Sequence, residues 1–124
     1  MEKSFHQGNR NRLYDGMKTD SLLVLFSGTE LRKTNDEYYP FFTDRNFYYL
    51  TGLDSKNFVL LAMKGSDGSV EERIYILPPD PMQERWTGTR IKPQEAEDLS
   101  GIRDVRFVDA FSDDFHKLAV CGRY

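Results

Sequence analysis

The sequence lacks the features that mark several large classes of protein. Its 124 residues contain a single cysteine, Cys121, so no disulfide framework can form, and a reducing, cytoplasmic compartment is the simplest expectation. The apolar runs, such as residues 22–26 and 58–63, are far shorter than the ~20 residues that cross a bilayer. The first residues are polar and carry no apolar stretch of the kind found in signal peptides. We therefore expect neither a membrane span nor secretion.

The chain also has few histidines and a small net charge. The net charge is −3, which disfavours nucleic-acid binding through bulk charge. The two histidines, His6 and His116, lie far apart and in no metal-binding spacing, so we expect both to be structural or solvated and the chain to hold no metal. Glycine-rich phosphate loops and the nucleophile-elbow pattern are absent as well. The residues alone thus indicate no catalytic centre.

Aromatic residues, in contrast, are plentiful. Nine Phe, seven Tyr and one Trp stand in a chain that is 39% apolar. This composition is enough to build a hydrophobic core, and the length suits one domain over residues 1–124.

The apolar pattern predicts an α/β domain. The Gly- and Asp-rich stretch 64–69 predicts a hairpin that makes the strands on either side of it antiparallel. The first apolar run is expected to be a strand buried on both faces. Strands and helices alternate, which favours a mixed sheet with helices on both faces, although the strand order cannot be read. The expected strands cover 22–26, 58–63, 72–77 and 105–108, and the expected helices cover 9–17, 43–52, 81–85, 92–101 and 109–119.

A first aromatic cluster occupies residues 38–52. Seven aromatic residues fall within twelve positions, which predicts a core helix and its approach loop. Asp44 is suited to cap this helix, Asn46 to bond locally, and Gly52 to end the helix. The alternative is an aromatic surface for a partner subunit.

A second cluster occupies residues 84–90. Trp86 is predicted to lie in a Gly- and Thr-rich loop between Arg85 and Arg90. Tryptophan and arginine are enriched in binding hot spots, so this loop is a candidate interface or ligand rim. The arginines suit a carboxylate and the indole ring suits a proline ring. The alternative is that Trp86 simply folds over its own loop.

Both clusters resemble signature blocks of one known family. Residues 42–52, ending Tyr-Leu-Thr-Gly, resemble the first block of the N-terminal domain of aminopeptidase P, prolidase and creatinase proteins. Residues 77–90, with Trp86-Thr-Gly-Thr-Arg90, resemble the second block. The resemblance covers residues 9–118 and implies the ribonuclease H-like architecture of that domain. Within the first block it assigns a structural motif made of Asp44, Asn46, Tyr48, Tyr49 and Gly52.

The resemblance also implies a function. In the family this domain precedes a catalytic "pita-bread" domain, absent from this chain, which holds two Mn or similar divalent ions and cleaves the bond between an N-terminal residue and proline. The N-terminal domain is implied to support a homo-oligomer and to shape the mouth of an active site. Trp86 matches a tryptophan that reaches the neighbouring subunit's site, and Arg90 matches the arginine of the same block. The implied partners are the catalytic domain, a neighbouring subunit and a peptide with proline second.

Two other functions stay open at this point. The same scaffold serves as a protein- or peptide-binding module in chaperone-like proteins, and the acidic stretch 95–98 is the feature that supports it. A creatinase-type amidinohydrolase parent is the other alternative, which residues outside this chain would decide.

Overall fold

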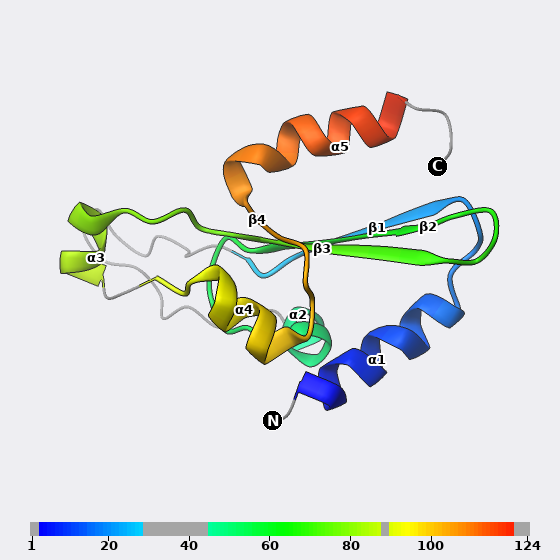
Figure 1. The fold of residues 1–124 in the computed structure, drawn as a ribbon, viewed down its shortest axis with the longest axis horizontal. Helices are drawn as coiled ribbons and strands as arrows, with labels where there is room; N and C mark the ends of the chain where they lie inside the picture. The colour runs from blue at the N-terminus through cyan, green and yellow to red at the C-terminus, as the bar shows by residue number, and fades with distance from the viewer. Residues whose placement is uncertain (1–2, 29–44, 88–89, 121–124) are drawn as a thin grey trace.

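The computed structural model describes residues 3–28, 45–87 and 90–120, and it shows a four-stranded sheet flanked by helices (Figure 1). The strand order follows the chain, β1-β2-β3-β4. The strands are β1 (Ser21–Phe26), β2 (Val59–Lys64), β3 (Val70–Ile76) and β4 (Val105–Phe107). The helices are α1 (Lys3–Asp15), α2 (Arg45–Thr51), α3 (Pro81–Thr87), α4 (Pro93–Ser100) and α5 (Phe111–Val120), with a 3-10 turn, η1 (Val108–Ala110), before α5.

The sheet is mixed, as the sequence predicts. β1 pairs antiparallel with β2, and β2 with β3, whereas β3 and β4 run parallel. The hairpin between β2 and β3 closes through a bond from the Gly65 amide to the Ser69 carbonyl, 2.9 Å long. The parallel pairing of β4 follows from the crossover through α3 and α4, which returns the chain to the same end of the sheet.

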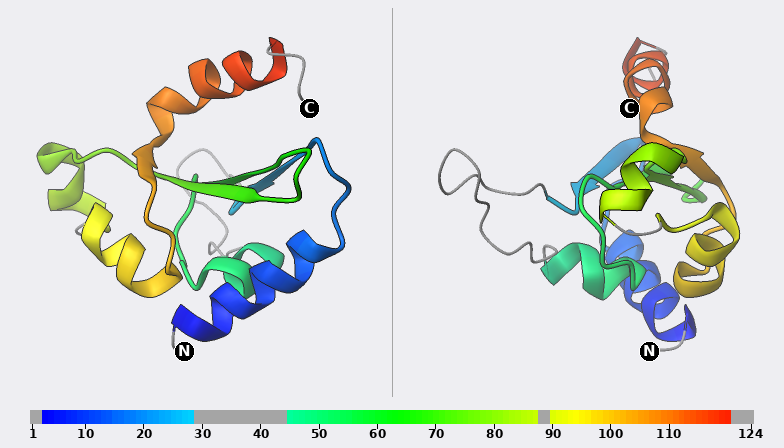
Figure 2. Two further views of the ribbon diagram at one scale, coloured as in Figure 1. Left: turned by 45° about the vertical axis from the view of Figure 1, so that its right-hand side comes forward. Right: turned by 90° about the vertical axis from the view of Figure 1, so that its left-hand side faces the viewer.

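Helices cover both faces of the sheet, which confirms the predicted fold class. α1, α2 and α4 lie on one face and α5 lies on the other (Figures 1 and 2). The side chains of β2 alternate between the two faces, as the period of a strand requires. Leu60 joins the core beneath α2 and α4 with Phe47 and Ile74, and Leu61 joins the core beneath α5 with Tyr75 and Phe111.

The structure corrects several local predictions. The first strand is not buried on both faces: β1 is the edge strand of the described sheet, its residues are half-buried, and 58% of Phe26 is exposed. The fully buried strand is β2, because it is an inner strand whose residues join the cores on both faces of the sheet. The first helix begins at Lys3 and ends at Asp15, earlier at both ends than predicted. The last helix, α5, begins at Phe111, two residues later than predicted, because Asp109 lies within η1.

The second helix is predicted well because its end is encoded locally. Gly52 follows α2 with a φ of +72°, and its amide donates to the Tyr48 carbonyl at 2.8 Å. Thr51 donates its hydroxyl to the Phe47 carbonyl and accepts from the Leu53 amide. The Leu-Thr-Gly ending of the first signature block is therefore a helix C-terminus that turns the chain into β2.

No helix in the described part of the chain is long and apolar enough to span a bilayer.

Candidate functional site

The second sequence cluster lies in the segment that connects β3 to α4, which makes an excursion away from the sheet. α3 lies beyond the end of the sheet, away from α1, α2 and α5 (Figures 1 and 2). Trp86 belongs to this helix, which corrects the predicted loop: Pro81 begins a helix that continues to Thr87. Arg85 is exposed on it, as is Met82, at 76%. Residues 88 and 89, and the Trp86 side chain, lie outside the described structure.

Arg90 closes this excursion at its base. The Arg90 Nη1 donates to the carbonyl oxygen of Pro78, 2.6 Å away, and the Arg90 amide donates to Glu84 Oε1 at 2.7 Å. Arg90 is half-buried, whereas Arg85 is exposed. The two arginines of the predicted rim therefore have different surroundings: Arg85 faces solvent and Arg90 binds the protein's own backbone.

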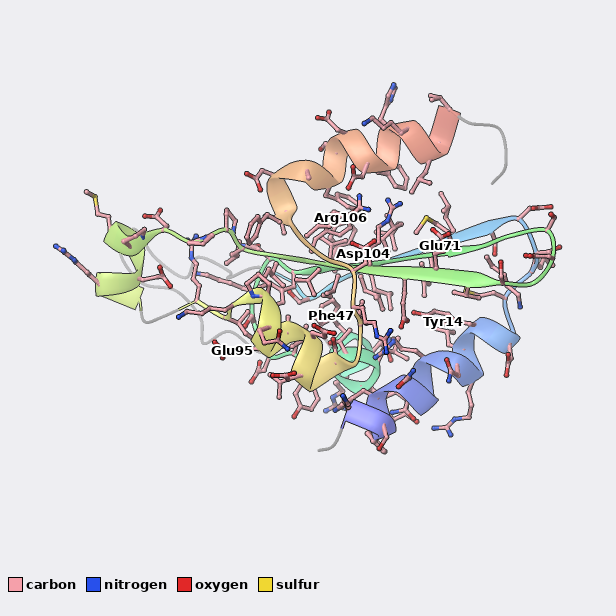
Figure 3. The ribbon with its side chains drawn as sticks, in the orientation of Figure 1. Tyr14, Phe47, Glu71, Glu95, Asp104 and Arg106 are labelled. Atoms are coloured by element: carbon pink, nitrogen blue, oxygen red, sulfur yellow. The ribbon has the colours of Figure 1, made fainter. Side chains whose placement is uncertain are left out.

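The first cluster lies elsewhere, on α2 beneath the sheet (Figure 1). Asp44 falls outside the described residues. Asn46 is exposed on the first turn, and Tyr48 and Tyr49 are 39% and 48% exposed. Of the aromatic residues on α2, only Phe47 is buried in the core (Figure 3). Residues 38–44 of the first cluster lie outside the described residues, and the part of it on α2 lies apart from α3 (Figures 1 and 2).

Sequence reasoning missed a buried polar network that joins α1 to the sheet. Arg10 is fully buried, and its Nε donates to Glu72 Oε2 at 2.8 Å while its Nη1 donates to the Leu50 carbonyl at 2.8 Å. The Tyr14 hydroxyl also donates to Glu72 Oε2, and Tyr14 points from α1 toward the sheet in Figure 3. Burial, together with the nearby Glu72 carboxylate, raises the pKa of Tyr14 above its usual range. Tyr14 is thus a hydrogen-bond donor at any physiological pH.

Two further contacts complete this attachment of α1. Lys64, nearly buried on β2, donates Nζ to the carbonyl oxygens of Tyr14 and Met17 at 2.7 and 2.9 Å, which caps the helix C-terminus. At the other end, His6 Nδ1 lies 2.9 Å from the Tyr49 carbonyl. Because a carbonyl oxygen only accepts, Nδ1 carries the proton. His6 is thus structural and His116 is exposed on α5, as expected.

A signal for this network exists in the sequence. Glu72 stands two residues before Ile74 on β3, so it faces the same side of the sheet as a core residue. A charged residue at an inward strand position requires a buried partner. The partner itself, 62 residues away on α1, cannot be read from spacing.

A second polar network holds α5 to the opposite face. The Asp114 carboxylate accepts from the Tyr75 hydroxyl at 2.8 Å and from Arg106 Nη1 at 2.9 Å. Arg106 also binds Asp104, and Arg106 lies between the sheet and α5 in Figure 3. Burial alone would raise the pKa of Asp114, but these two donors outweigh it and lower that pKa. Burial, helped by donation to Asp114, raises the pKa of Tyr75.

A polar hollow of about 540 Å³ lies between α1, α4 and the first residues of β3. It is open to solvent, and both cations and carboxylates line it. The lining residues are Lys3, Gln7, Glu71, Glu72, Glu97, Gly101, Arg103 and Asp104. Within the described ranges, no three His, Cys, Asp or Glu side chains come together in a way that would hold a metal ion. The chemistry that these residues offer is hydrogen bonding and charge, not a metal centre.

Comparison with known proteins identifies the scaffold. Residues 6–123 match the family model described as "Aminopeptidase P, N-terminal domain". An Xaa-Pro aminopeptidase of Haemophilus influenzae is 34% identical over 113 residues, which are 90% of this chain and 26% of that protein. Xaa-Pro aminopeptidase 3 of Homo sapiens is 29% identical over 96 residues, which are 75% of this chain and 19% of that protein.

Solved structures of aminopeptidase P contain the same fold. A structure assigned as aminopeptidase P from Bacillus anthracis superposes with a TM-score of 0.93 at 35% identity, covering 97% of this chain and 28% of that one. Escherichia coli aminopeptidase P with the inhibitor Pro-Leu superposes with a TM-score of 0.86 at 22% identity, covering 95% and 27%, which shows the shared fold. The chain spans roughly a quarter of the length of these solved relatives.

Proposed function

Because this chain belongs to the family of aminopeptidase P N-terminal domains, we propose that it is the amino-terminal, non-catalytic part of an Xaa-Pro aminopeptidase. Such a parent hydrolyses the bond between an N-terminal residue and a following proline. The observation that carries the proposal is the match over residues 6–123 to a domain that makes up only about a quarter of relatives named for this activity. Those names also favour an aminopeptidase over a creatinase-type parent.

The catalytic metal ions belong to the remainder of the parent under this proposal. The described residues provide no set of His, Cys and carboxylate side chains that fits a pair of Mn or similar ions. His6 is committed to the Tyr49 carbonyl, and the carboxylates of Glu72 and Asp114 are committed to arginine and tyrosine. No catalytic step is assigned to this chain.

The role we assign to the chain is to shape the mouth of an active site in a cytoplasmic homo-oligomer. α3 is the element suited to this, because it extends beyond the sheet and carries Trp86 and the exposed Arg85 (Figure 1). An indole ring offers a flat apolar face for a proline ring, and a guanidinium offers a fork for a carboxylate. We propose that α3 presents Trp86 to the proline-containing peptide at a neighbouring subunit's site.

The substitution Trp86→Ala in the parent enzyme tests this role. We expect kcat/KM for an Xaa-Pro peptide to fall about thirtyfold, which corresponds to about 2 kcal/mol for a hot-spot aromatic. The bound metal content should not change, because α3 is not a metal-binding element in this proposal. Trp86→Phe, which keeps a flat ring, should retain most of the activity. An unchanged kcat/KM in Trp86→Ala would reject the assignment.

A further inference from the structure

The base of α3 is closed by one residue at the end of the excursion. The segment leaves β3 through Pro78 and reaches α4 through Arg90, and the Arg90 guanidinium joins these two points through its 2.6 Å bond to the Pro78 carbonyl. The Arg90 amide reaches into the excursion and donates to the Glu84 carboxylate at 2.7 Å. The Glu84 amide in turn donates to the Asp80 carbonyl at 2.9 Å. These bonds link the start, the middle and the end of the segment.

α3 needs such bonds because it is short. A helix of seven residues is too short to be stable through its own hydrogen bonds. Among its described side chains, Pro81, Met82 and Arg85 are exposed. The bonds of Arg90 and Glu84 at the base of α3 are therefore suited to hold its direction.

We propose that Arg90 and Glu84 are positioning residues, which hold α3 so that Trp86 is presented correctly and which do not themselves bind the peptide. This inference rests on the proposed function and adds to it. The resemblance groups Arg90 with Trp86 at the rim, but in the structure the Arg90 guanidinium binds the Pro78 carbonyl and its amide binds Glu84. Both bonds are made to groups of the domain itself.

Fluorescence of the 124-residue protein tests the structural half of the inference. Trp86 is the single tryptophan, so its emission reports on α3 alone. Arg90→Met and Glu84→Ala should each lower the emission anisotropy and increase quenching by acrylamide, because the base of the helix is released. Glu84→Gln keeps an oxygen that can accept from the Arg90 amide and should behave as the unsubstituted protein. Lys92→Met, a matched loss of an exposed cation nearby, should also leave both readings unchanged. Unchanged emission anisotropy and unchanged acrylamide quenching in Arg90→Met and Glu84→Ala would overturn the inference.

A double-mutant cycle in the parent enzyme tests the functional half. Arg90→Met alone should lower kcat/KM on the order of tenfold, because a misplaced contact group loses much of its effect. In a Trp86→Ala background the same change should cost almost nothing, since there is no indole left to position. Arg90→Lys, which retains a donor for the Pro78 carbonyl, should recover part of the loss.

The possible outcomes of this cycle separate the two proposals. If Trp86→Ala has no effect on kcat/KM, the proposed rim function fails. If Trp86→Ala lowers kcat/KM but the effect of Arg90→Met adds to it in full, Arg90 acts independently of Trp86 and the positioning role is overturned. If Arg90→Met alone has no effect, the positioning role is overturned as well.

Discussion

Replacing Gly52 with Ala is expected to lower the free energy of unfolding by about 3 kcal/mol. Two costs add at this position. Gly52 has a φ of +72°, a conformation that an L-residue adopts only with strain. A Cβ built there lies 2.6 Å from Cδ2 and Nε2 of His6, and that ring is buried and held by the Tyr49 carbonyl. The ring cannot move aside without losing its hydrogen bond.

Chemical denaturation of matched variants separates the two costs. Gly68 also has a positive φ, +83°, but a Cβ there meets nothing within 4 Å. Gly68→Ala should therefore show the backbone strain alone, about 1 kcal/mol. In a His6→Ala background, the cost of Gly52→Ala should fall toward that value. Equal costs for Gly52→Ala and Gly68→Ala in the otherwise unchanged protein would contradict the proposed contact with His6.

Replacing Arg10 with Met is expected to cost about 3 kcal/mol of unfolding free energy. Met matches the length and helix propensity of arginine, so the loss isolates the guanidinium. The substitution leaves the Leu50 carbonyl and the Glu72 carboxylate without their main donor in a largely dehydrated place. The Glu72 side chain is 24% exposed, so the expected loss of stability lies at the lower end of the range for a broken buried pair.

The same helix supplies a control for this prediction. Arg12 is exposed one half-turn further along α1, and Arg12→Met should change stability by less than about 0.5 kcal/mol. Adding Glu72→Gln to Arg10→Met should restore part of the loss, because a neutral amide costs less than a carboxylate to keep in this place without the guanidinium. A loss in Arg10→Met no greater than in Arg12→Met, measured by urea denaturation, would show that the Arg10 network does not hold α1 to the sheet.

The fold was predictable where the signal is local. The apolar runs at β2 and β3, the turn between them and the glycine after α2 each encode their structure within a few residues, and all are found as predicted. The burial of β1 was misjudged because an apolar run does not reveal whether a strand is paired on one side or two. Position in a sheet is a property of the whole chain.

The polar contacts that fix α1 were not predictable for a similar reason. Arg10 meets partners 40 and 62 residues away, and a basic residue on a mostly polar helix reads as solvated. The α3 segment was half predicted: Pro81 marked its start, but the glycine after Thr87 suggested a loop at Trp86. The bond from Arg90 to the Pro78 carbonyl forms only when the segment closes on itself. The spacing of residues in the sequence does not show that closure.

The most direct test of the central claim compares the 124-residue protein with the product of the complete reading frame. Both are assayed with added Mn²⁺ on a peptide with proline in the second position, and release of the first amino acid is measured. We predict turnover by the complete product and none by the 124-residue protein, since the described residues offer no metal centre. Turnover by the 124-residue protein alone, or none by the complete product, would contradict the account.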